Sequence, residues 1–165
     1  MKIIIIILFF ICFYSTPNKM SDTFHIKVEK RYFSNNLIKD TFELKVKGNS
    51  LETAKVYFKI FSNDGFLLYS NETYLDNIIR LYDTQEYTKE EILNQFFEDF
   101  FEGFIKPPIE NNYVYNEDYS QCSRETWDDI RLNNKGLIGF CYAFGNSNIC
   151  IVYYNNQVII YESCC

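Results

Sequence analysis

The sequence predicts an α+β fold: a mostly antiparallel sheet of about six or seven strands, with one long and one short helix packed on one face. Three observations lead to this prediction. Apolar and polar residues alternate in several segments, two-residue turn signals such as Asp64-Gly65 separate neighbouring segments, and one stretch from Thr88 has helical spacing. Strands joined by short loops pair antiparallel, because parallel pairing needs a long crossover.

Length and composition predict one globular domain. The chain has 165 residues, of which 47% are apolar and 19% aromatic, enough for a sizeable core. Its net charge is −6. This acidic balance argues against nucleic acid as a partner, and also against electrostatic docking on anionic lipid.

The N-terminus predicts export. Residues 3–14 form an unbroken run of twelve apolar residues after Lys2, typical of a signal-peptide core and shorter than the ~20 residues that span a bilayer as a helix. We therefore expect residues 1–16 to be a signal peptide or N-terminal membrane anchor, and residues 17–165 to be a single α+β domain. The alternative is a buried N-terminal strand.

The residues after the apolar run carry a resemblance. Phe13-Tyr14-Ser15 is followed by Thr16, and over about twenty residues this region resembles the export signals of small lipoproteins from AT-rich Gram-negative bacteria. Thr16 stands where those signals have the acceptor cysteine. The resemblance implies a location in the periplasm or cell envelope, with membrane contact only through the N-terminal segment.

The first strands are predicted from alternation. Phe24, Ile26 and Val28 are expected to face the core, and the polar residues between them the solvent. Residues 41–47 repeat this pattern. Asp64-Gly65 then predicts a type I′ hairpin turn between residues 53–61 and 66–75, which places Ile60 opposite Tyr69.

Two helices follow. Thr88-Lys89-Glu90-Glu91 has the pattern of a capping box, in which the threonine and glutamate side chains bind each other's backbone amides. A wide apolar face follows and ends near Gly103, and we expect it to lie across the sheet. Ser123 is expected to cap a short helix that contains Trp127.

Three C-terminal strands are predicted at residues 136–144, 148–154 and 157–162. Gly145-Asn146 as a two-residue loop places Cys141 opposite Cys150, and an oxidising compartment would favour a disulfide between them. Two alternatives remain open: a longer loop over residues 145–148 would shift the register, or the two cysteines would pack reduced. Asn155-Asn156 is expected to form the last turn.

Catalytic and metal-binding patterns are weak. His25 is the only histidine and lies on the predicted polar side of its strand, the cysteines lack zinc-ligand spacing, and no cofactor motif is present. We therefore expect no cofactor and no metal. Acidic groups at residues 98–102, 117–118 and 128–129 are expected to be solvated surface charge.

The long loop over residues 109–122 is the predicted functional region. Aromatic side chains on or beside it are candidate anchors for a protein partner, or else a cover for the open face of the sheet. They are Tyr113, Tyr115, Tyr119 and Trp127.

The resulting functional hypothesis is a non-enzymatic, exported or membrane-tethered domain that binds a basic secreted or envelope protein, in the manner of an immunity protein or inhibitor. One alternative is a small hydrolase that uses paired carboxylates or a thiol among Cys122, Cys164 and Cys165. Another is a structural envelope protein without a specific ligand.

Overall fold

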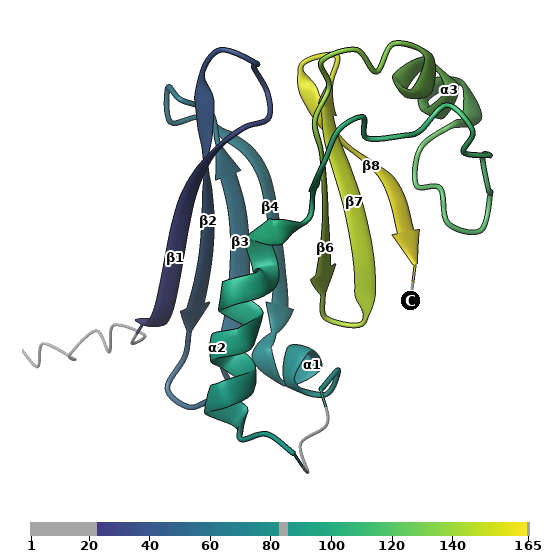
Figure 1. Ribbon diagram of the computed structural model, residues 1–165. Helices are drawn as coiled ribbons and strands as arrows, with labels where there is room; N and C mark the ends of the chain where they lie inside the picture. Colours follow the sequence, from purple (N-terminus) through teal and green to yellow (C-terminus); the bar gives the residue numbers. More distant parts are fainter. Residues whose placement is uncertain (1–22, 83–85, 165) are drawn as a thin grey trace, which may run out of the picture.

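The computed structural model describes residues 23–82 and 86–164, which form two four-stranded antiparallel sheets (Figure 1). Sheet A contains β1 (Thr23–Tyr32), β2 (Lys39–Lys47), β3 (Lys55–Phe61) and β4 (Leu67–Tyr74) in sequence order. Sheet B contains β5 (Phe104–Ile105), β6 (Gly139–Phe144), β7 (Ser147–Tyr154) and β8 (Gln157–Cys164), also in sequence order. The helical elements are α1 (Leu75–Ile79), α2 (Lys89–Asp99), the 3₁₀ turn η1 (Phe100–Glu102) and α3 (Arg124–Leu132).

The α+β class and the antiparallel pairing are confirmed, whereas the single sheet with helices on one face is only roughly matched. The two-residue β5 brings the described strands to eight, and they divide into two sheets. The short helix α1 directly follows β4, close to where the predicted strand ends, and was not predicted. The predicted signal or anchor at residues 1–16 lies outside the described residues. Within the described ranges, no helix is long and apolar enough to cross a membrane.

Aromatic side chains join the two sheets. Phe42 of β2 and Phe58 of β3 are fully buried, and Phe58 lies 4.9 Å from Tyr142 between ring centroids. Phe140 of β6 contacts both phenylalanines. The same side of sheet A is covered by α2 and η1, which lie in front of it in Figure 1. Sheet B therefore has sheet A on one side, and its other side packs against α3 through a second cluster that includes Trp127, Ile130 and Tyr161.

Helix α2 begins as predicted. The Thr88 side chain accepts from the backbone N–H of Glu91, and the Glu91 carboxylate accepts from the N–H of Thr88 at 2.8 Å, so the capping box is confirmed. The apolar face is buried against sheet A and β6. Gly103 ends η1, and its carbonyl accepts the N–H of Cys141 at 2.8 Å, which starts sheet B.

The predicted orientation of β1 is wrong. Ile26 and Val28 are 50% and 51% exposed, and the half-buried His25, Lys27 and Glu29 face the interior. Lys27 donates to the carbonyls of Phe97 (2.8 Å) and Glu98 (3.0 Å) at the end of α2. A helix C-terminus leaves carbonyls without intrahelical partners, and an ammonium group satisfies them. Because β1 packs beside the end of a helix, its polar side faces inward and its apolar side faces the solvent.

The hairpin predictions are largely confirmed. Ile60 pairs with Tyr69, but the loop covers residues 63–65 and not two residues. Only Gly65 has a positive φ (83°), which indicates a type I turn followed by a glycine bulge in place of the expected type I′ turn. At the last hairpin, Asn155 and Asn156 both have positive φ, as a two-residue type I′ loop requires.

Candidate functional site

The β6–β7 hairpin carries the predicted disulfide. Phe144 pairs with Ser147 across the Gly145-Asn146 loop, and the same register places Cys141 opposite Cys150. Their sulfur atoms are bonded, with the Cα atoms 4.1 Å apart. The N–H of Cys141 points away from β7 and donates to Gly103, so this is a non-hydrogen-bonded pair, in which opposed side chains come closest. The two-residue loop is confirmed.

A cavity of about 490 Å³ lies on the side of sheet B that faces away from sheet A. The disulfide forms part of its wall, and the segment from Ile105 to Tyr113 forms another part. Trp127 contributes from α3, and Tyr161 and Glu162 contribute from β8. The volume lies within the range of small-ligand sites, or of a pocket for one partner side chain.

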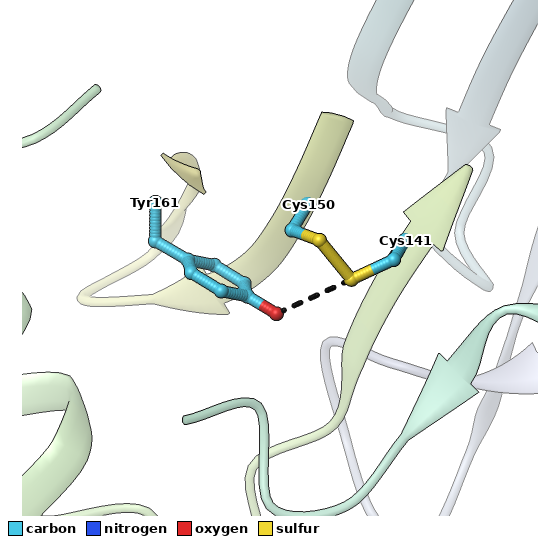
Figure 2. The surroundings of a disulfide bond; sticks show 3 residues. All are labelled: Cys141, Cys150 and Tyr161. Atoms are coloured by element: carbon cyan, nitrogen blue, oxygen red, sulfur yellow. Dashed lines mark hydrogen bonds between the residues drawn. A yellow bond between two sulfur atoms is a disulfide. The ribbon is translucent and has the colours of Figure 1, made fainter. Parts of the chain in front are cut away.

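Tyr161 lines the cavity and also contacts the disulfide. Figure 2 shows its hydroxyl directed at the Cys141 sulfur, at 3.5 Å. Burial raises the pKa of the Tyr161 phenol well above its usual range, and the charge of Glu162 adds to the shift. The phenol is protonated at neutral pH and, because of the raised pKa, remains so into alkaline solution; its O–H is the donor, since a disulfide sulfur carries no proton.

Hydrogen bonds tie the long loop to the body of the protein. The side chain of Arg131 donates to the carbonyl of Asn111 at 3.1 Å, and Asn134 donates to the carbonyl of Ile109 at 3.2 Å. At the other end of the loop, the N–H of Ser163 in β8 donates to the carbonyl of Tyr119 at 2.8 Å. These contacts hold the cavity wall in a defined position.

The four predicted aromatic residues divide into two pairs. Trp127 is 3% exposed and packs edge-on against Tyr115, whose hydroxyl donates to the carbonyl of Cys122 at 3.3 Å. Tyr113 and Tyr119 are 54% and 47% exposed. The structure therefore places one pair in or against the second core cluster and leaves the other pair exposed at the surface. Tyr113 also lines the cavity.

The segment that carries the long loop and α3 is rich in carboxylates, and two carboxylates line the cavity. Residues 104–134 carry six carboxylates against three basic side chains. Glu110 and Glu162 line the cavity together with Lys106. The sequence did not single out Glu110 or Glu162, because they are distant in sequence and only the loop and β8 bring them to one cavity.

Of the acidic groups considered from the sequence, Asp128 and Asp129 have structural partners. Asp128 forms ion pairs with Arg131 at 3.1 Å and with Arg124 at 3.7 Å. Asp129 accepts from the Tyr154 hydroxyl and from Asn133. Asp128 therefore pairs within α3, whereas Asp129 ties α3 to β7 through Tyr154.

Of the thiol and histidine candidates, Cys165 lies outside the described residues, and the others lie in different parts of the fold. The His25 ring packs on Phe97 of α2, with ring centroids 4.5 Å apart. Cys122 and Cys164 are free thiols on the long loop and β8, and burial raises the pKa of Cys122. A raised pKa lowers the thiolate fraction and hence reactivity. Among the described residues, no group of three or more histidine, cysteine or carboxylate side chains is placed to hold a metal ion.

Comparison with protein-family models, curated proteins and solved structures gives no match for this chain.

Proposed function

We propose that this chain is a non-enzymatic binding domain, exported or membrane-tethered, that holds a basic protein partner at residues 104–134. The observation that carries the proposal is the cavity beside the disulfide, where exposed Tyr113 lies with two carboxylates, Glu110 and Glu162. Aromatic faces and carboxylates both attract an ammonium or guanidinium group. The cavity is therefore suited to a lysine or arginine side chain that projects from the partner.

The partner class follows from the charge. An acidic surface that presents exposed aromatic side chains complements a basic secreted or envelope protein, as an immunity protein or inhibitor does. The Cys141–Cys150 disulfide is compatible with an oxidising compartment, where such a partner would be met.

The test uses a probe that mimics one basic side chain. N-acetyl-arginine methylamide, titrated into the ¹⁵N-labelled chain, is expected to shift amide signals of cavity residues saturably, and the norleucine analogue is not. Glu162→Gln should weaken arginine binding about fivefold, because it removes one partly exposed charge partner. Glu117→Gln removes an exposed charge that does not line the cavity and should leave the affinity unchanged. Equal shifts with the norleucine analogue would contradict the proposal.

A carboxylate-dependent hydrolase is the second candidate, because Glu110 and Glu162 line one cavity. Glycoside hydrolysis needs two carboxyl groups across a cleft. If this candidate is correct, Glu110→Gln and Glu162→Gln should each abolish turnover of a β-linked glycan by the chain. The candidate is removed if the natural chain shows no turnover. It is also removed if the double variant turns the glycan over as fast as the natural chain does.

A further inference from the structure

The outward side of sheet A is basic, although the protein is acidic. Cross-strand pairs such as Lys45 with Tyr57 and Glu43 with Lys59 put these side chains on the side opposite the buried Phe42 and Phe58. We call this side the outer face of sheet A. Six of the twelve lysines of the chain lie on it, against two glutamates: Lys30, Lys39, Lys45, Lys47, Lys55 and Lys59. The net charge of the whole chain, −6, does not reveal that positive charge is concentrated on this face.

Four of these six lysines form no ion pair among the described residues, although Lys59 stands opposite Glu43. Lys45 pairs with Glu43 at 3.3 Å, and Lys55 pairs with Glu72 at 2.7 Å. For the other four lysines of the face, no carboxylate within the described ranges lies within 4.0 Å. Lys47 also lies directly opposite Lys55, and like charges opposed on neighbouring strands destabilise a sheet. An anionic surface placed over the face would relieve this repulsion.

Exposed apolar side chains accompany the lysines. Ile26, Val28 and Tyr32 stand on β1, and Leu67 and Tyr74 stand on β4. Lys39 lies over the Tyr32 ring at 5.3 Å, and Lys55 over the Tyr74 ring at 5.3 Å. Helix α2, η1 and β6 pack on the other side of the sheet. The outer face is thus a mixture of cationic and apolar groups that no described element covers.

We propose that the outer face of sheet A docks on the surface of an anionic phospholipid bilayer. Lysines at such a surface bind lipid phosphates, and apolar and tyrosine side chains beside them enter the interfacial region. The N-terminal segment favours this occupant over a soluble polyanion: only residues 15–22 separate the apolar run at 3–14 from β1, a reach of at most about 28 Å. A second copy docked face to face would oppose two lysine-rich surfaces. This proposal departs from two expectations drawn from the sequence: that the acidic net charge disfavours docking on anionic lipid, and that membrane contact is confined to the N-terminal segment.

Lysine footprinting of the full chain on lipid nanodiscs tests the proposal. On discs that contain phosphatidylglycerol, acylation of Lys30, Lys39, Lys47 and Lys59 should slow, and acylation of Lys89 and Lys135 should not. On phosphatidylcholine discs, the face lysines should react as they do without lipid. High salt should restore their reactivity on the anionic discs, because screening weakens exposed charge contacts.

A pair of matched variants measures the strength of binding. Lys47→Gln/Lys59→Gln should lower partitioning to anionic discs, relative to phosphatidylcholine discs, by about 25-fold, since each lysine near such a surface strengthens binding about fivefold. Lys89→Gln/Lys135→Gln removes the same charge away from the face and should change this ratio less than threefold. Equal effects of the two variants, or no protection on anionic discs, would overturn the proposal. Stronger protection of the face by poly-glutamate or a thymidine oligonucleotide than by anionic discs would also overturn it, in favour of a soluble polyanion.

Discussion

Gly103 has a steric requirement that its backbone angles do not reveal. Its φ is −81°, which any residue adopts, but a Cβ at this position would overlap the carbonyl oxygen of Cys141. We expect Gly103→Ala to lower the free energy of unfolding by about 3 kcal/mol or more, because the β5–β6 backbones must separate. Gly65→Ala is the matched control: its Cβ meets open space and only the positive φ is strained, so about 1 kcal/mol is expected. Equal losses in urea denaturation would contradict this steric explanation.

Buried tyrosines predict loss of stability in alkali. Burial raises the pKa of Tyr142 and of Tyr161 far above the unfolded value of about 10. Above pH 10 the unfolded chain therefore binds fewer protons than the folded one, and stability falls with rising pH by up to about 1.4 kcal/mol per pH unit for each tyrosine. Below pH 10 both states are protonated and these two residues cause no slope. Urea unfolding from pH 9 to 11 should show a smaller slope for Tyr161→Phe, and an unchanged slope would refute the assignment.

At the scale of single elements, Lys27 and Lys30 test the orientation of β1. Lys27 faces inward and donates to two carbonyls at the end of α2, whereas Lys30 faces outward. We expect Lys27→Met to lower the free energy of unfolding by about 1–2 kcal/mol, since it leaves helix-end carbonyls without their charged donor. Lys30→Met should change it by less than about 0.5 kcal/mol. The sequence-predicted orientation reverses the two positions: Lys27→Met would be mild at a solvent-facing site, and Lys30 would lie on the core side with Ile26 and Val28, so a mild Lys27→Met in chemical denaturation would contradict the orientation in the structure.

The β6–β7 hairpin allows a test of the disulfide. Cys141 and Cys150 are nine positions apart, and the entropy of closing so short a loop gives about 2–3 kcal/mol of stabilisation. Cys141→Ala/Cys150→Ala should lower the free energy of unfolding by that amount. Intact-mass measurement after alkylation, with and without reduction, should show two additional modified thiols only in the natural chain. The same number of modified thiols before and after reduction would show that the bond is absent.

The local elements were predictable because their determinants are neighbours in sequence. The Thr88–Glu91 capping box, the Gly145-Asn146 register and the Asn155-Asn156 turn each depend on a few adjacent residues. The orientation of β1 was not predictable in this way, because alternation shows that the strand has two unlike sides and does not show which side a helix end will meet. The same holds for the site: Glu110 and Glu162 share a cavity only through the tertiary fold.

At the scale of the whole molecule, charge is separated across the layers. Sheet B and its core contacts lie between sheet A and α3, so the lysine-rich outer face and the acidic residues 104–134 are on opposite sides of the layered structure (Figure 1). This division could not be predicted from the sequence, because hairpin patterns identify neighbouring strands and do not show that β4 and β6 belong to different sheets.

Because of this layering, the two proposals together predict that lipid and the arginine probe bind independently. A chain docked through the outer face of sheet A would direct the cavity with Tyr113 and Glu162 away from the bilayer. We therefore expect the affinity for N-acetyl-arginine methylamide to be the same within twofold in solution and on nanodiscs that contain phosphatidylglycerol. The Glu162→Gln effect should persist on the discs, because the lipid and the probe meet different layers of the protein. Loss of arginine binding on anionic discs, with the lysines of the outer face still reactive, would show that the cavity side is the one that meets the lipid.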